Sequence, residues 1–307
     1  MAQYFIMFGA AFGISLLLTP WVSKLAFKIG AVDKPGKRKV HTKLMPRLGG
    51  VAVFAGFMAI AVIFYGFDTR VLGIMAGGSV ILLLGILDDK YDLPARYKLL
   101  GQIAAASLVV ATGTVIRFVD NPFDGYIGLG AFAIPLTILW IVGITNALNL
   151  IDGLDGLASG ISLIALATFT IMAYRTDQVV VAMLTLALAG AVLGFLKYNF
   201  HPASIFLGDS GAMFLGFMIA SLAVMGLLKS VTAVTFVIPV LVLAVPIFDT
   251  AFAMLRRFLN GKPIMHADKG HLHHRLLAFG LSHKQVVLVI YGFSIVSSLA
   301  AMFVLYR

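Results

Sequence analysis

Long apolar runs limit what this 307-residue chain can fold into more than any other feature. The hydrocarbon core of a bilayer is about 30 Å thick, so a helix that crosses it needs roughly 20 apolar residues. Hydrophobic residues make up 61% of the chain and charged residues 12%, which excludes an ordinary water-soluble enzyme. The sequence predicts one domain, residues 1–307, folded as an all-α, polytopic membrane helical bundle. About ten transmembrane helices are expected, over residues 2–22, 49–66, 71–87, 99–116, 128–148, 157–173, 179–196, 212–228, 232–253 and 286–306.

The distribution of positive charge predicts the orientation of this bundle. No basic segment precedes the first apolar run, and Lys24 and Lys28 follow it, which places the N-terminus outside. Alternate connections then share one side and hold 18 of the 23 Lys and Arg and all seven His. The positive-inside rule makes that side cytoplasmic. The net charge of +10 is therefore assigned to an anionic membrane surface, and no nucleic acid is expected as a partner.

Three carboxylates, Asp88, Asp89 and Asp92, stand where the third apolar run ends. In a helix Asp88 and Asp92 share one face, and Asp89 is rotated by about 100° from them. A solvated helix end with three surface acids is one interpretation. A site in which a cation lies among the acids is the other, because carboxylates beside a membrane are unfavourable without one.

A second cluster contains Asn149, Asp152 and Asp155. A helical turn would present all three on one side, where the two carboxylates repel each other unless a divalent cation or a cationic ligand lies between them. A polar turn that caps and breaks helices is the alternative.

A third cluster, which includes Asn199, leads into the eighth apolar run. Asp209 or Ser210 is placed to be the N-cap of that helix. A helix N-terminus flanked by glycines is also a ready site for phosphate, and both interpretations can hold together.

The fourth cluster is a histidine loop before the last run, formed by His266, His271, His273, His274 and Arg275. Histidine is a common zinc ligand, so zinc is one hypothesis. The spacing is not a familiar zinc pattern and the adjoining cations would repel a metal, so a cradle for anionic oxygens is favoured.

The first basic connection contains Arg38, His41 and Arg47. Such a connection is most often a topology determinant drawn to anionic lipid head groups. These three residues could in addition hold a phosphate.

Together these clusters offer oxygen and imidazole ligands, with no cysteine or glutamate anywhere in the chain. Hard oxygen ligands favour Mg²⁺ or Mn²⁺, and Mg²⁺ is usually held by carboxylates together with substrate phosphates. Phosphoryl transfer needs such a metal, a cationic clamp and a carboxylate near the acceptor. The membrane setting indicates a lipid phosphate as one substrate and a soluble nucleotide as the other.

Five segments resemble, in the same order, the signature blocks of the polyprenyl-phosphate N-acetylhexosamine-1-phosphate transferases: residues 33–50, 88–102, 146–160, 199–211 and 266–277. The histidine block is similar to that of bacterial undecaprenyl-phosphate GlcNAc-1-phosphate transferases of the wall teichoic acid or O-antigen type. The resemblance implies transfer of GlcNAc-1-phosphate from UDP-GlcNAc to undecaprenyl phosphate with release of UMP, assisted by Mg²⁺ or Mn²⁺. It also implies a multi-pass protein of the bacterial plasma membrane, surrounded by membrane lipid, for which a homodimer is left open.

The same resemblance implies a role for each candidate residue. Catalysis is expected of Asp88, Asp89 and Asp209, and metal binding of Asp209, Asp89 and Asp152. The nucleotide sugar is expected at Asn149, Asp152, Asp155, Asn199, His271, His273, His274 and Arg275, and the lipid phosphate at Arg38, His41, Arg47 and Lys98.

Two alternatives remain. A sister transferase could use another UDP-N-acetyl sugar. A transporter or flippase is the competing class, since Pro239 and Pro246 fit a broken helix. Transporters place charges near the bilayer midplane, however, whereas every cluster here adjoins one face.

Overall fold

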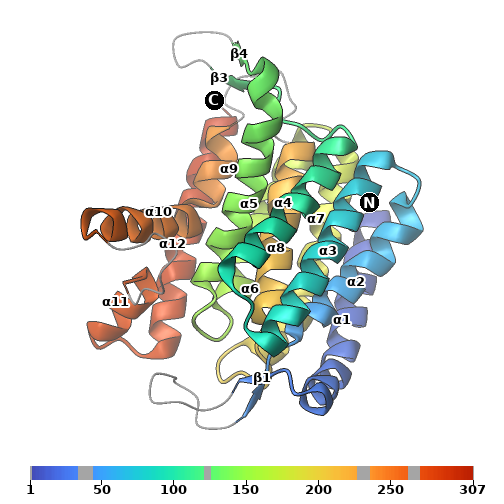
Figure 1. Ribbon diagram of the computed structural model, residues 1–307. Coiled ribbons are helices and arrows are strands. Elements are labelled where there is room, and N and C mark those ends of the chain that lie inside the picture. The colour runs from blue at the N-terminus through green and yellow to red at the C-terminus, as the bar shows by residue number, and fades with distance from the viewer. Residues whose placement is uncertain (1, 34–43, 121–125, 227–235, 262–269, 307) are drawn as a thin grey trace.

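The computed structural model describes residues 2–33, 44–120, 126–226, 236–261 and 270–306, and this part of the chain is mostly helical (Figure 1). The longer helices are α1 (Ala2–Ile29), α2 (Gly49–Tyr65), α3 (Thr69–Tyr91), α4 (Ala95–Ala111), α5 (Ala133–Ile151), α6 (Leu157–Arg175), α7 (Val179–Asn199), α8 (Gly208–Met225), α10 (Ala244–Leu259) and α12 (His283–Leu305). The shorter ones are α9 (Val237–Val242), α11 (Leu272–Ala278) and the 3-10 turn Gly130–Phe132. Two antiparallel pairs complete the list, β1 (Val32–Asp33) with β2 (Met45–Pro46) and β3 (Phe118–Asp120) with β4 (Tyr126–Gly128). The prediction of a helical bundle is confirmed.

Seven of the described helices are long and apolar enough to cross a membrane: α1, α3, α5 with the 3-10 turn before it, α6, α7, α8 and α12. Helices α2 and α4 have 17 residues each. The chain is therefore a multi-pass membrane protein by length and composition. The count of about ten spans and the external N-terminus stay predictions.

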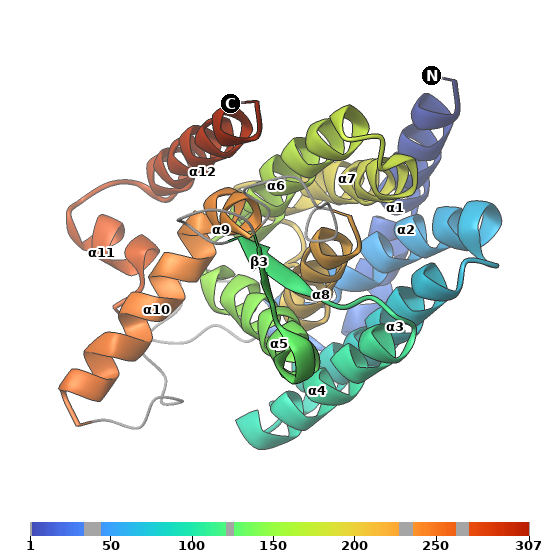
Figure 2. The ribbon, with the colours of Figure 1, turned by 90° about the horizontal axis from the view of Figure 1, so that it is seen from above.

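The prediction of one helix over residues 232–253 is wrong. The described part of this run breaks at Leu243 into α9 and α10. Pro246, in the first turn of α10, has no N–H group to donate to the preceding turn and its ring crowds that turn, which favours a break just before it. Helix α10 lies at a steep angle to the bundle and projects from it (Figures 1 and 2).

Helix α8 lies at the centre of the bundle, between α3 and α5 (Figure 2). Every residue of α8 is buried except Asp209, in its first turn. Glycines let neighbouring helices approach its backbone, as is usual in membrane bundles. A methyl group on Gly85 of α3 would overlap the backbone of Ser210, and one on Gly50 of α2 would overlap the backbone of Gly211. The packing of α8 thus fixes the position of Asp209.

Gly85→Ala should destabilise the bundle by about 1–3 kcal/mol, because the backbone of α8 cannot yield to the added methyl group. The measurement is the thermal unfolding midpoint in detergent. Gly143→Ala is the control, since a methyl group there would meet nothing within 4 Å. Equal midpoints for the two variants would contradict the close packing of α3 on α8.

The described segments that carry the polar clusters lie at one end of the bundle, opposite the β3–β4 pair (Figure 1). This arrangement agrees with the prediction that the clusters share one face.

Candidate active site

Backbone hydrogen bonds anchor the segment that carries Arg47. Its N–H donates to the carbonyl oxygen of Ala31 at 3.1 Å. The carbonyl oxygen of Pro46 accepts from the N–H of Phe206 at 2.8 Å, and the N–H of Gly49 donates back to Phe206 at 3.0 Å. These bonds tie the segment before α2 to the segment before α8, so the first and third predicted clusters meet.

Asp89 caps α8 from a neighbouring helix. Its Oδ1 accepts from the N–H of Asp209 at 2.8 Å, and its Oδ2 accepts from the N–H of Ser210 at 3.0 Å. Helix α8 begins at Gly208, so the prediction that Asp209 or Ser210 is its N-cap is wrong. A carboxylate beside the first N–H groups of a helix and the positive end of its dipole is stabilised by about 0.3–2 kcal/mol. Both N–H groups are therefore bonded to protein and are not free for a phosphate.

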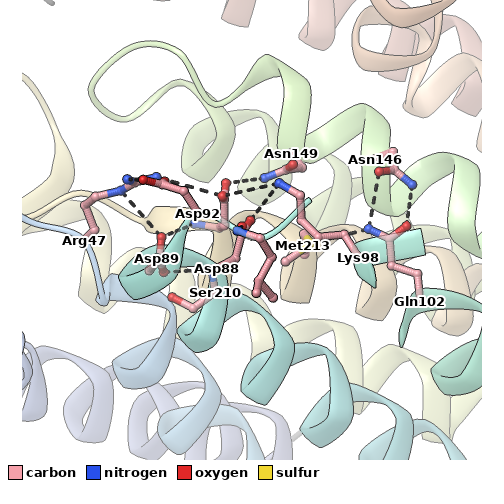
Figure 3. Close-up of polar contacts among 12 residues, drawn as sticks. Arg47, Asp88, Asp89, Asp92, Lys98, Gln102, Asn146, Asn149, Ser210 and Met213 are labelled. Atoms are coloured by element: carbon pink, nitrogen blue, oxygen red, sulfur yellow. Dashed lines mark hydrogen bonds and ion pairs between the residues drawn. The ribbon is translucent and has the colours of Figure 1, made fainter. Parts of the chain in front are cut away.

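Asp88 is 2% exposed, and both of its oxygens have partners. Oδ1 accepts from the N–H of Leu93 at 2.8 Å, and Oδ2 accepts from Nζ of Lys98 at 2.8 Å (Figure 3). The carboxyl group of Asp209 is a neighbour of that of Asp88, where α8 packs on α3. Two carboxyl groups this close require a proton or a cation near them. Lys98 supplies positive charge to both, since its Nζ is 3.9 Å from Oδ2 of Asp209.

Asp209 is the most accessible of these three carboxylates, with 25% of its side chain exposed against 2% for Asp88 and 0% for Asp89. Its Oδ1 accepts from Nδ2 of Asn149 at 2.7 Å, which joins the second cluster to the third. Among the described residues, its Oδ2 makes two longer ion pairs, to Arg47 and to Lys98, each at 3.9 Å. Asp209 is therefore the carboxylate best placed to reach a ligand.

Arg47 faces four carboxylates, at 3.9 Å from Asp33, 3.6 Å from Asp89, 3.8 Å from Asp92 and 3.9 Å from Asp209. Burial alone would lower the pKa of its guanidinium group, but these acids outweigh burial and raise the pKa above its ordinary value. Arg47 is a permanent positive charge at the edge of the carboxylate group.

Two side-chain amides hold α4, the helix that carries Lys98, against α5. Nδ2 of Asn146 donates to Oε1 of Gln102 at 2.6 Å, and Nε2 of Gln102 donates to Oδ1 of Asn146 at 3.3 Å (Figure 3). The same Nε2 lies 3.4 Å from the sulfur of Met213 in α8. These amides, to which sequence patterns assign no role, connect α4, α5 and α8.

Asp152 lies in the turn between α5 and α6. Burial raises its pKa well above the ordinary value, and the nearby carboxylates of Asp209 and Asp89 raise it further. Such a group is stabilised as an anion only when positive charge is close. The carboxylates of Asp209 and Asp89 are therefore close enough to act on Asp152, and the binding of a metal ion by Asp152 stays a prediction.

Asp155 and Asn199 bond to other parts of the protein. Oδ2 of Asp155 accepts from the N–H of Ala203 at 3.1 Å and lies 2.9 Å from Nδ1 of His201. The amide of Asn199 accepts from the hydroxyl of Ser159 and donates to the backbone before α8. Both residues brace the 200–207 segment, and their binding of a nucleotide stays a prediction.

A carboxylate that the sequence analysis missed, Asp249 of α10, holds the histidine loop. Its Oδ2 is 2.9 Å from Nδ1 of His271, and its Oδ1 accepts from the N–H of Leu272 at 2.7 Å. The side chains of His271 and Asp249 are 6% and 7% exposed. A single charge inside an apolar run was the available signal, because ionisable residues at membrane depth are usually functional.

His273 joins the histidine loop to the second cluster. Its ring lies against Gly153, where a Cβ atom would have no room. Burial, followed by the neighbouring His274 and His271, lowers the pKa of His273 to about 4, so the imidazole is neutral at pH 7. Within the described residues, no three of the loop's side chains converge as metal ligands.

The remaining predicted residues are placed as follows. His274 is exposed, and Arg275 lines a separate pocket between α10 and α11. Arg38, His41 and His266 lie outside the described residues.

Asp249→Asn should loosen the histidine loop. The Asn side chain has one acceptor oxygen, whereas Asp249 offers one oxygen to His271 and the other to the N–H of Leu272. Loss of a hydrogen bond to a charged group weakens local structure by about 1.5–3 kcal/mol, so backbone hydrogen exchange in residues 272–278 should accelerate roughly tenfold or more. Exchange in α3 and α8 should not change. The matched control is Asp177→Asn, an exposed residue in the loop between α6 and α7. Unchanged exchange in α11 would show that Asp249 does not hold the loop.

Comparison with known proteins bears on this geometry. Residues 71–227 match a family described as glycosyl transferase family 4. This chain belongs to glycosyl transferase family 4. The matched stretch of the family 4 chain includes the carboxylates Asp88, Asp89, Asp152 and Asp209.

Relatives of this family 4 chain extend the similarity to Arg47 and the histidine loop. A Bacillus subtilis (strain 168) protein named as a probable undecaprenyl-phosphate N-acetylglucosaminyl 1-phosphate transferase is 53% identical over 93% of this chain and 80% of its own length. A decaprenyl-phosphate N-acetylglucosaminephosphotransferase of Mycolicibacterium smegmatis is 38% identical over 91% of this chain and 76% of its own length. A phospho-N-acetylmuramoyl-pentapeptide-transferase of Carboxydothermus hydrogenoformans is 32% identical over 92% of both chains. The family resemblance drawn from the five ordered motifs is confirmed.

Proposed function

We propose that this protein transfers GlcNAc-1-phosphate from UDP-GlcNAc to undecaprenyl phosphate, giving undecaprenyl-diphosphate-GlcNAc and UMP. The observation that carries the proposal is the group formed by Asp88, Asp209, Lys98 and Arg47 at one end of a membrane bundle. It combines acidic and cationic side chains where a lipid head group can meet a soluble nucleotide. The 53% identity to the Bacillus subtilis protein supports this choice of sugar and lipid.

The reaction is a displacement at phosphorus. An oxygen of the lipid phosphate attacks the β-phosphorus of UDP-GlcNAc. The bond from that phosphorus to the oxygen bridging the α-phosphorus breaks, and UMP leaves with that oxygen. Charge develops on phosphate oxygens throughout, so positioning and electrostatic stabilisation provide most of the catalysis.

Lys98 and Arg47 would bind phosphate oxygens. The Nζ of Lys98 is held at 2.8 Å by a carboxylate of low exposure, so its position is fixed before substrate binds. The charge of Arg47 is permanent, because its four acidic neighbours raise the pKa of the guanidinium group above its ordinary value. Asp88 would thus orient the lipid phosphate through Lys98, and its direct action as a base stays a prediction.

Mg²⁺ or Mn²⁺ is proposed as the cofactor, and the donor set fits either ion. The candidate ligands are oxygens, Asp88 and Asp209 lie side by side, and the anionic form of Asp152 needs nearby positive charge. Asp209 and Asp152 would hold the ion. Asp89 is a less accessible candidate because α8 occupies both its oxygens. When bound, the metal would neutralise charge on the diphosphate.

The finer topology belongs to the same proposal. About ten crossings with an external N-terminus would put the polar end in the cytoplasm, where UDP-GlcNAc is available. The lipid-linked product would begin an envelope polysaccharide of the wall teichoic acid or O-antigen type.

The test is UMP release by the purified chain in detergent, with undecaprenyl phosphate, Mg²⁺ and a panel of UDP-sugars. We expect UMP with UDP-GlcNAc only when the lipid is present, inhibition by EDTA, and full recovery with Mg²⁺ or Mn²⁺. Release with another UDP-N-acetyl sugar alone would identify a sister transferase. Absence of UMP with every sugar, together with lipid or sugar movement across vesicles, would favour a transporter.

A further inference from the structure

Two side chains of helix α12 form hydrogen bonds with the backbone of the turn between α5 and α6. Nε2 of His283 accepts a hydrogen bond from the backbone N–H of Asp155 at 2.9 Å. The hydroxyl of Tyr291, two turns further along α12, donates to the carbonyl oxygen of Gly156. Gly156 is the N-cap of α6 and has a positive φ of 75°, a conformation that glycine adopts readily, so the chain turns here into α6.

The first turn of α12 is itself held in place. Ser282 is its N-cap and forms a reciprocal capping box with Gln285. His283 follows Ser282 directly, and its ring stacks on that of His201 with 4.3 Å between centroids and 21° between planes. His201 in turn contacts the carboxylate of Asp155 at 2.9 Å. The backbone and the side chain of Asp155 are therefore held by one pair of stacked imidazoles.

These three side chains also offer three potential metal ligands within 4.8 Å of one another. The hydrogen bonds argue against a metal there. The Nε2 lone pair of His283 already accepts the N–H of Asp155, and the positive end of that N–H dipole would repel a cation. The arrangement is instead that of a brace around a backbone turn.

We propose that His283 is a positioning residue for the nucleotide end of the substrate, acting through the backbone of Asp155. This inference rests on the proposed function and on the expectation, implied by the family resemblance, that Asp152 and Asp155 line the nucleotide sugar. The hydrogen bond fixes the turn before UDP-GlcNAc binds, so less ordering is needed on binding. Its loss should weaken nucleotide binding and leave the phosphoryl-transfer step largely unchanged.

Two variants distinguish the hydrogen-bond acceptor of His283, its Nε2, from the ring that stacks on His201. His283→Phe keeps a stacking ring and removes the acceptor, whereas His283→Gln places an amide oxygen within reach of the same N–H group. Nδ1 of His283 is buried without a partner among the described residues. Loss of this nitrogen in either variant should therefore not by itself destabilise the protein. Exposed Lys284→Met is the neighbouring control.

The experiment measures KM for UDP-GlcNAc, KM for undecaprenyl phosphate and kcat, with UMP binding by calorimetry as a readout independent of turnover. For His283→Phe we expect KM for UDP-GlcNAc and the Kd for UMP to rise roughly 5- to 10-fold, the effect of one net hydrogen bond. The lipid KM and kcat should stay within about twofold, below the effect of a single hydrogen bond, and His283→Gln should restore most of the loss. If His283→Phe does not fold, Tyr291→Phe removes the second contact and should shift the same two quantities.

Unchanged KM and Kd in a folded His283→Phe or Tyr291→Phe protein would overturn the proposal, as would a His283→Gln variant no better than His283→Phe. Stoichiometric zinc in the purified protein, lost in His283→Phe, would also overturn it in favour of a metal site. Failure of the proposed function gives a different result, since the unmodified chain would then release no UMP.

Discussion

Asp209→Asn should abolish turnover while leaving the bundle folded. Asp209 is the accessible member of the carboxylate group, and Asn at this position can still accept the hydrogen bond from Asn149. The change removes one negative charge from the proposed metal site with little change in shape. Removing a single electrostatic contact to a reacting centre typically reduces kcat on the order of 10²–10³-fold, and loss of a metal ligand should reach at least that. UMP release at saturating Mg²⁺ is the measurement.

The control for Asp209→Asn is Asp177→Asn, which makes the same chemical change at an exposed residue of the loop between α6 and α7. Asp177 has a positive φ of 55°, a conformation that Asn accepts readily. We expect it to retain full activity. If Asp209→Asn keeps activity within about tenfold of the unmodified chain, the role of Asp209 is to position Asn149 and not to bind the metal.

Lys98→Met should reduce both activity and stability. Removing the ammonium group leaves Asp88, which is 2% exposed, without its 2.8 Å ion pair. Breaking a fully buried pair on one side costs about 3–5 kcal/mol, and we expect less here because the Lys98 side chain is 25% exposed. The proposed phosphate clamp is lost at the same time. We therefore expect a lower thermal midpoint in detergent and a fall in UMP release of at least two orders of magnitude, comparable with other losses of charge stabilisation.

A second variant separates the two effects of Lys98. In Asp88→Asn/Lys98→Met the carboxylate is replaced by a neutral amide, so the thermal midpoint should recover while activity stays low. Lys90→Met is the control for loss of a lysine, since Lys90 is exposed at the end of α3. Recovery of activity in the double variant would mean that Lys98 only neutralises Asp88. An unchanged thermal midpoint in Lys98→Met would contradict the buried ion pair.

Sequence patterns predicted the class of fold because membrane insertion depends on local properties. The length and apolarity of each run are sufficient to predict a membrane helix, whatever its neighbours are. Alternation of crossings then places every second connection on the same side, which brought the polar clusters to one end before any packing was known. Motif order added the family, which the match over residues 71–227 confirmed.

The break at Leu243 is one that sequence patterns can predict, because two prolines lie near it. Pro239 and Pro246 indicate a broken helix, a feature that on sequence grounds favours a transporter. The structure has the break in a family 4 chain, where it turns α10 aside and places Asp249 beside the histidine loop.

The role of each acid within the site depended on tertiary structure. Asp88 and Asp89 are adjacent in sequence, yet one pairs with Lys98 and the other caps α8, 120 positions away. That division follows from the rotation of α3 against α8 and from the close approach permitted by Gly85. His283 likewise reaches Asp155 across 128 positions. Local periodicity carries no information on such contacts, because the packing of helices distant in sequence decides which side chains and backbone groups meet.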